Sequence, residues 1–283
     1  LQRFLDSTKA NLFFAKGIIM VEGDAESLLL PTLADVIGIN LEKHGISVVN
    51  VGGTGFFRYS RIFLRKDGSA IDVPISIITD CDIEPDKQDG EIDQRETETT
   101  AAIVAIQRKY NVGCINAFVA PKWTFEYSVA FSCLRDMLYE SILQAKKIEN
   151  SDQYALTAAK IEEIEKNLAE EKMKWSTQEP CVTAYQIYHD TMLNKGEPVV
   201  KTKATSKAIV AQCLASNLRW AITEIASAGE GGTPLPKERM FDLDLYQTHT
   251  DEAKRVALAE EIEKDPYLSY LVLAIKHAAG IEG

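Results

Sequence analysis

The sequence GIIMVEGDAE, residues 17–26, marks the point where a buried strand gives way to a helix. The four apolar residues before Glu22 are too few to cross a membrane and are typical of a buried strand. The chain turns at Gly23, and Asp24 is expected to cap the helix that begins there. Glu22 and Glu26 then lie at the carboxyl edge of a parallel strand, where open α/β sheets bind ligands. Two carboxylates at one place need a cation between them, unless the corner is solvated and its acids interact only with the helix dipole.

Strand-like and helix-like segments alternate after this stretch. Residues 24–37 carry apolar side chains at helical spacing, and residues 46–51 (ISVVNV) and 73–79 (VPISIIT) form two further apolar strands. A helix at 96–110 precedes a short strand at 114–119. This alternation predicts an α/β fold with a parallel, doubly wound sheet.

The strand pattern ends near residue 130. Long helical patterns follow at 131–148 and 153–174, and a helix at 206–226 comes after a basic link. Two closing helices are broken at Pro266, because proline cannot continue a helix. We therefore expect the first part of the core (1–130), a helical insertion (131–195), a return to the core (196–228) and C-terminal helices (229–283).

A second pair of acids follows the third strand. Asp80 and Asp82 lie two residues apart, so in an extended segment their side chains point the same way. Neighbouring strands are about 4.8 Å apart, so acids that end two of them can share divalent ions. Oxygen ligands without a histidine or cysteine cluster favour Mg²⁺ or Mn²⁺. We expect a metal site formed by Glu22, Glu26, Asp80 and Asp82, whose carboxylates would raise one another's pKa without an ion.

Two further acids are candidate ligands. Glu84 lies in an acidic stretch, residues 83–95, that is expected to be a mobile loop beside the site, and a plain solvated acid is the alternative. Glu126 opens a helix after the fourth strand and could reach the same edge, although a first-turn glutamate also suits the helix dipole.

The turn at residues 52–55 (GGTG) is a candidate phosphate-binding site. Gly53 and Thr54 could present backbone amides to an anion at a helix start, with Arg58 and Arg61 behind them. A tight turn before a solvated basic helix explains the same residues, and the sequence contains no P-loop. Lys203 and Lys207, near the start of a later helix, could stabilise a phosphoryl transition state or could simply form a solvated face.

Composition narrows the class of protein. The 283 residues carry a formal net charge of −11, which does not favour broad attraction to nucleic acid, so local basic patches or bridging metal would be needed. No apolar run is long enough to span a membrane. The five cysteines lack metal-site spacing, which predicts reduced, mostly buried thiols in a cytoplasmic protein. The first residues lack an initiator methionine, so a fragment of a longer chain is expected.

The acidic motifs VEGDAE and ITDCD resemble those of Toprim domains, the metal-dependent modules of topoisomerases, primases and several nucleases. A closer resemblance, to the OLD (overcoming lysogenization defect) family of nucleases, covers roughly residues 1–130 and 195–225. It is carried by FFAKGIIMVEGDAESLLLP (13–31), VVNVGGTGFFRY (48–59), TFEYSVA (124–130) and KAIVAQCLA (207–215).

The resemblance implies a Toprim, Rossmann-like sheet with an inserted or appended helical domain. It also implies a DNA endonuclease that uses two Mg²⁺ or Mn²⁺ ions, with exonuclease activity as an additional option. Lys207 falls where the family has its functional lysine, with Lys203 as a competing assignment. Glu22 would serve as ligand or base. The resemblance also implies an N-terminal ABC-type ATPase domain in the full-length chain, and it leaves a homodimer open.

Three other functions fit the same residues. A Toprim module can transfer strands, although none of the ten tyrosines has a diagnostic context for the nucleophile. It can also process RNA. A third alternative is a non-catalytic, metal-organised module that serves the ATPase.

Overall fold

The computed structural model describes residues 12, 14–53, 55–64, 72–88, 91–151, 156–196, 203–225, 237, 240–241, 243 and 248–281, and only the backbone of Phe57, Arg61 and Ile225. Four strands pair in parallel in the order β2-β1-β3-β6. They are β1 (Gly17–Val21), β2 (Ile46–Asn50), β3 (Ile75–Thr79) and β6 (Ile115–Val119). The predicted parallel α/β sheet is confirmed, and its two central strands, β1 and β3, are buried along their whole length.

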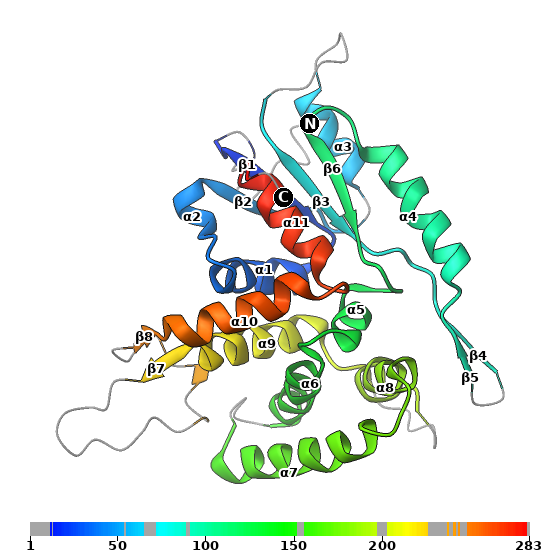
Figure 1. Cartoon of the computed structure of the whole chain (residues 1–283), viewed down its shortest axis with the longest axis vertical. Coiled ribbons are helices and arrows are strands. Elements are labelled where there is room, and N and C mark those ends of the chain that lie inside the picture. Colours follow the sequence, from blue (N-terminus) through cyan, green and yellow to red (C-terminus); the bar gives the residue numbers. More distant parts are fainter. Residues whose placement is uncertain are drawn as a thin grey trace.

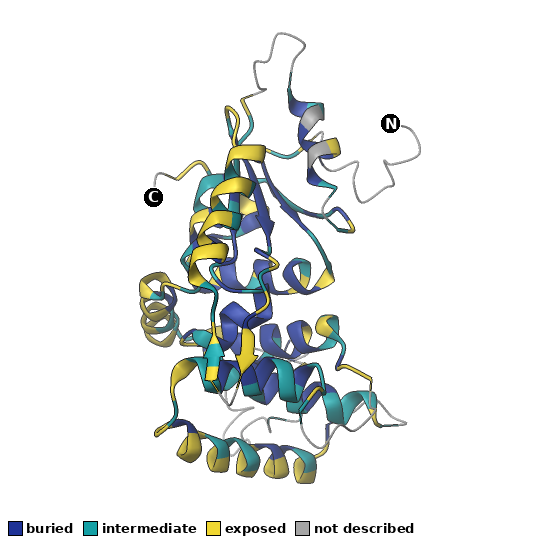
Figure 2. Ribbon diagram, turned by 90° about the vertical axis from the view of Figure 1, so that its right-hand side faces the viewer, coloured by how far each residue is buried: buried dark blue, intermediate teal, exposed yellow. Residues whose placement is uncertain are grey.

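The sheet has an apolar core on each face, because successive strand residues point to opposite sides. On one side Ile18 and Met20 pack with α3 (Phe56–Ser60) and with Tyr110, the last residue of α4 (Glu96–Tyr110). On the other side Ile19 and Val21 belong to a larger core that includes α1 (Asp24–Val36), α9 (Lys207–Ala221) and α11 (Ser269–Ala278). Figure 2 shows the buried sheet between its covering helices.

The last helix lies along the sheet and runs antiparallel to the strands (Figure 1). The backbone of Ala278 contacts Gly17, where an added Cβ atom would lie 1.9 Å from the carbonyl oxygen of Ala278. Farther along both segments, the Ser76 hydroxyl donates a hydrogen bond to the carbonyl oxygen of Ala274 at 2.7 Å. The C-terminal end of α11 therefore lies at the start of the strands, and its N-terminal end lies at their carboxyl edge.

Helices gather below the carboxyl edge of the sheet in Figure 1. Between residues 131 and 195 the described part of the chain is helical and contains no strand, as predicted. Helix α9 packs against both α1 and α6, and so it joins the sheet layer to these helices. The helices here are α5 (Phe125–Phe131), α6 (Arg135–Glu149), α7 (Ala158–Trp175) and α8 (Pro180–Tyr185), followed by a π-helical segment (Gln186–Met192).

Several local predictions are wrong. The acidic stretch at 83–95 contains an antiparallel hairpin, β4 (Asp86–Gln88) and β5 (Glu91–Asp93). The helix predicted at 206–226 ends at Ala221 and is followed by β7 (Thr223–Ile225), which pairs with β8 (Thr248–Thr250). Only two of the five free cysteines, Cys81 and Cys213, are buried.

The closing helices are confirmed as α10 (Glu252–Lys264) and α11, and they are separated at Pro266. Small α2 (Leu41–His44) precedes β2, and a 3-10 turn (Arg61–Phe63) follows α3. Among the helices that the structure describes, none combines the length and apolarity that a membrane crossing requires. The loop expected at 229–236 lies outside the described residues.

Candidate active site

Four carboxylates meet at the carboxyl edge of the two central strands. Glu22 directly follows β1, and Glu26 lies in the first turn of α1. Asp80 directly follows β3, and Glu126 lies in the first turn of α5. Glu26 and Glu126 are buried, at 7% and 3% exposed. The parallel pairing of β1 with β3 explains why acids far apart in the sequence come together here.

The electrostatics of the site confirm that these acids act on one another. The pKa of Glu26 is raised to about 7, mainly by burial and in smaller part by the charges of Glu126 and Glu22, while its own backbone amide and Lys207 act in the opposite direction. The pKa of Asp80 is also raised. Burial is the largest cause, and the charges of Glu126 and Glu26 act in the same direction. Of the four acids for which a mutual rise in pKa was predicted, Glu26 and Asp80 have a raised pKa, and burial contributes more to it than the neighbouring charges do.

Lys207 is the cation of this cluster. It is the first residue of α9, and its Nζ lies 2.8 Å from Oε2 of Glu126. Burial disfavours the charged ammonium, but the neighbouring Glu126 outweighs this effect, so the pKa of Lys207 is raised. Its ammonium also lies 5.8 Å from the ring centre of Tyr188. Lys207 therefore stays protonated at neutral pH.

Neighbouring groups that the sequence did not single out hold the acids in place. The hydroxyl of Thr79 donates a hydrogen bond to Glu22, and the amide of Asp80 approaches the same oxygen at 3.4 Å. The amide of Phe125 donates to Oδ1 of Asp80 at 2.7 Å, and the Thr124 hydroxyl donates to Glu126 at 3.2 Å. Thr79 and Thr124 each lie within two residues of a predicted ligand, and this adjacency was the only available signal.

The structure does not bring the other two predicted ligands into the cluster. Asp82 is exposed and has a φ of 58°, so the prediction of an extended segment after Asp80 is wrong. Its amide donates to the carbonyl oxygen of Trp123 at 3.1 Å. Glu84 is also exposed, and its charge acts on Tyr185 of α8. Neither acid is among the charges that shift the pKa of Glu26 or Asp80.

The glycine turn is built differently from the predicted phosphate cradle. The amide of Gly53 donates to the carbonyl oxygen of Glu22 at 2.8 Å, and the amide of Gly52 donates to Oδ1 of Asn50 at 2.7 Å. Both amides are therefore engaged within the protein. Arg58 is exposed on α3, while Thr54 and the side chain of Arg61 lie outside the described residues.

The start of α1 also differs from the prediction. Gly23 is its N-cap, and no side chain caps the helix, so the capping role predicted for Asp24 is wrong. Asp24 instead accepts a hydrogen bond from the side-chain amide of Asn50 at 2.7 Å. Asn50 therefore links the first turn of α1 to the glycine turn.

Lys203 lies apart from Lys207. It is exposed, its carbonyl oxygen accepts a hydrogen bond from Asn194 at 2.6 Å, and it lines a different hollow with Lys146 and Glu149. Of the two competing lysines, only Lys207 contacts a predicted ligand, Glu126.

The donor chemistry of the cluster suits a hard divalent cation. All four side chains are carboxylates, the hard oxygen ligands that such an ion prefers. The buried hydroxyl of Tyr270, on which the same acids act, has no hydrogen-bond partner. Among the described residues, no three acidic, histidine or cysteine side chains converge closely enough to bind one ion together. Here Lys207 and Thr79 occupy carboxylate oxygens that an ion would use.

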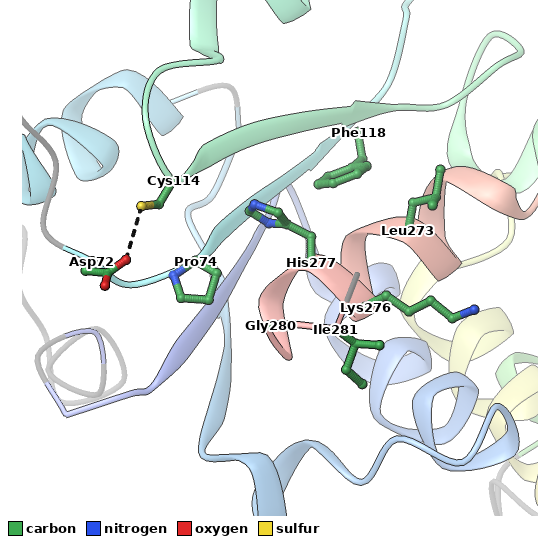
Figure 3. Close-up of a pocket in the computed structure, with 9 residues that line it drawn as sticks. All are labelled: Asp72, Pro74, Cys114, Phe118, Leu273, Lys276, His277, Gly280 and Ile281. Atoms are coloured by element: carbon green, nitrogen blue, oxygen red, sulfur yellow. Dashed lines mark hydrogen bonds between the residues drawn. The ribbon is translucent and has the colours of Figure 1, made fainter. Parts of the chain in front are cut away.

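A separate hollow lies at the opposite edge of the sheet (Figure 3). It has a volume of about 610 Å³, and His277 of α11 lies on its wall. The ring nitrogens of His277 lie 3.1 Å from the Ser76 hydroxyl and 2.9 Å from the side-chain amide of Asn116. Burial lowers the pKa of His277, so this neutral imidazole joins β3, β6 and α11 as a structural bridge.

The parallel sheet, with acids after its two central strands, defines a Toprim domain with additional helices. Residues 13–82 match the family model described as "Overcoming lysogenization defect protein-like, TOPRIM domain". The resemblance drawn from the sequence is thereby confirmed: this part of the chain is a Toprim region of the OLD type.

Solved structures of C-terminal regions of OLD proteins are similar to the chain. The Burkholderia pseudomallei protein is 20% identical, with a TM-score of 0.43 over 94% of this chain and 100% of that one. The Xanthomonas campestris pv. campestris protein is also 20% identical, with a TM-score of 0.43 over 95% of this chain and 96% of that one. No curated protein gives a significant match.

Proposed function

We propose that the chain is a nuclease that hydrolyses DNA phosphodiester bonds with two divalent cations, Mg²⁺ or Mn²⁺. The observation that carries the proposal is the buried carboxylate cluster, in which the pKa values of Glu26 and Asp80 are raised. A protein retains so unfavourable a group of charges when a function requires it. The OLD-type Toprim match points to the same chemistry.

Glu22, Glu26, Asp80 and Glu126 would hold the ions, and Asp82 at the exposed rim is a further proposed ligand. Bound ions of this kind activate water and stabilise the leaving oxygen of a phosphodiester. Thr79 and the amide of Phe125 orient Glu22 and Asp80 through the hydrogen bonds described above.

Lys207 has a separate role in this mechanism. Because its pKa is raised, it is cationic at neutral pH and serves as a proton donor or charge stabiliser, not as a base. Where Glu126 serves as a ligand, the ammonium of Lys207 would leave its ion pair with Glu126 and would interact with the phosphate. We further propose that the bound ions bridge the protein to the DNA phosphates, since the chain itself carries a net charge of −11 and does not attract DNA.

The proposal is tested by plasmid nicking with Mg²⁺ or Mn²⁺. Asp80→Asn keeps the shape of the side chain but removes a ligand charge, and we expect cleavage to fall by a factor of about 100 or more. Glu42→Gln, which changes an exposed acid of α2, is the matched control and should cleave as the wild type does. Undiminished cleavage by a folded Asp80→Asn protein would refute the assignment.

The reaction products distinguish the alternatives. Relaxed closed circles would indicate strand transfer, and cleavage of RNA in preference to DNA would indicate a ribonuclease. No turnover with any metal would favour a non-catalytic module. Regulation by an ABC-type ATPase domain of a longer chain and assembly as a homodimer in the cytoplasm remain part of the proposal.

A further inference from the structure

The hydroxyl of Tyr270 is a buried polar atom that the site described above does not use. Tyr270 lies in α11 and is 7% exposed. Its hydroxyl oxygen is one of two buried side-chain polar atoms, among the described residues, that have no hydrogen-bond partner. Buried hydroxyl groups are nearly always hydrogen-bonded in native proteins, so this one calls for a partner.

The course of α11 brings this hydroxyl to the carboxylates. Ser76 of β3 is bonded to Ala274 of α11, and from there the two segments run in opposite directions. Tyr270 lies one helical turn before Ala274, about 6 Å along the axis and on the same face. Side chains of a helix point toward its N-terminus, so the long tyrosine side chain extends farther toward the carboxyl edge, where Asp80 lies.

The charges around Tyr270 agree with this placement. Burial raises its pKa, and Asp80, Glu26 and Glu126 raise it further, in that order. The same three acids belong to the proposed metal site. A tyrosine hydroxyl is ordinarily protonated at neutral pH, so it is available as a hydrogen-bond donor.

Glu26 is the carboxylate that lacks such a donor. Glu22 receives a hydrogen bond from Thr79, Asp80 receives one from Phe125, and Glu126 receives one from Lys207. Within the described part of the chain, the carboxylate of Glu26 has a hydrogen bond only with its own backbone amide, although the charges of Glu126, Glu22 and Lys207 act on it. Helices α1 and α11, which carry Glu26 and Tyr270, pack against each other.

We propose that Tyr270 is a positioning residue of the metal site and that its hydroxyl donates a hydrogen bond to Glu26 when a divalent cation is bound. A ligand that gives one oxygen to a cation retains a second oxygen, and a donor on that oxygen fixes the orientation of the ligand. Tyr270 would supply to Glu26 what Thr79 supplies to Glu22. This inference rests on the proposed metal-dependent function.

The test compares Mn²⁺ binding, measured by isothermal titration calorimetry, in the wild type and in Tyr270→Phe. The variant keeps the ring and removes only the hydroxyl, and we expect it to bind Mn²⁺ about tenfold more weakly. In EDTA its melting temperature should equal or exceed that of the wild type, because an unpaired hydroxyl has been removed. Tyr139→Phe, which removes a hydroxyl near Glu171 on α7, is the control and should bind Mn²⁺ normally.

A double variant tests whether the effect passes through Glu26. In a Glu26→Gln background, adding Tyr270→Phe should cause no further loss of Mn²⁺ affinity. Unchanged affinity in Tyr270→Phe, a lower melting temperature in EDTA, or a wild type that binds no Mn²⁺ would each overturn the inference. If the wild type binds Mn²⁺ and Tyr270→Phe binds it weakly, but neither cleaves nucleic acid, then the proposed function fails while this inference stands.

Discussion

A single residue, Lys207, offsets part of the negative charge of the acidic cluster. Glu126 is almost fully buried, whereas the side chain of Lys207 is 46% exposed. A buried carboxylate without a partner is strongly unfavourable, so the pair matters mainly because one member cannot be solvated. The same lysine lowers the pKa of Glu26 and Asp80.

Removal of the Lys207 charge should therefore destabilise the metal-free protein. We expect Lys207→Met to lower the free energy of unfolding by about 1–3 kcal/mol, a value reduced from that of a fully buried pair because the lysine is partly solvated. Urea denaturation in EDTA measures the loss. Adding Glu126→Gln should restore part of it, while Lys203→Met should be nearly neutral. Equal stability of Lys207→Met and the wild type would contradict the role of Lys207 as counterion.

The raised pKa of Glu26 predicts that stability depends on pH. Between its ordinary value of 4.5 and about 7, the folded protein holds a proton that the unfolded chain has released. The free energy of unfolding should therefore fall as the pH rises through this range, by roughly 3 kcal/mol from this group. Asp80, whose pKa is also raised, adds to the fall in the same direction.

Denaturation at pH 5 and pH 8 in EDTA measures this dependence. Glu26→Gln should show a clearly smaller fall than the wild type, because glutamine does not titrate. Glu42→Gln controls for the change in net charge and should retain the full effect. The same pH dependence in Glu26→Gln and the wild type would contradict the prediction, because it would mean that ionisation of Glu26 does not lower the free energy of unfolding.

At the scale of elements, the contact between β1 and α11 depends on the absence of a side chain at Gly17. An added Cβ would meet the carbonyl oxygen of Ala278 at 1.9 Å, and neither the strand that carries Gly17 nor the helix that carries Ala278 can easily move. We expect Gly17→Ala to destabilise the protein by about 2 kcal/mol or more. Thermal denaturation is the measurement, and Gly55→Ala, whose nearest neighbour would lie at 3.9 Å, is the matched control. A similar melting temperature for both variants would contradict this packing.

Elements with strong apolar patterns were predictable from the sequence, and weakly patterned ones were not. The runs ending at Glu22 and Asp80 identified the two central strands because parallel strands are buried on both faces. The β4–β5 hairpin escaped prediction because its residues are mostly exposed and have no apolar alternation. The capping role of Asp24 was wrong because a hydrogen bond from distant Asn50 holds its carboxylate.

At the scale of the whole molecule, the site depends on segments that return to the sheet late in the chain. Glu22 and Asp80 could be placed together from strand order alone. Lys207 was found through the family resemblance, whereas Tyr270 gave no local signal, because only the antiparallel course of α11 brings it near the acids. The exposed position of Asp82 could not be predicted, since the chain after Asp80 leaves the extended conformation at Asp82, whereas a solvated Glu84 was one of the two alternatives that the sequence left open.

The most direct test of the central claim, that the carboxylate cluster holds divalent cations, is anomalous X-ray diffraction from crystals containing Mn²⁺. The account predicts two anomalous peaks about 4 Å apart among Glu22, Glu26, Asp80 and Glu126, and their loss in Asp80→Asn. A single peak there would contradict the two-ion mechanism. Crystals with Mn²⁺ bound only at other places, or with no peak between these carboxylates, would contradict the claim itself.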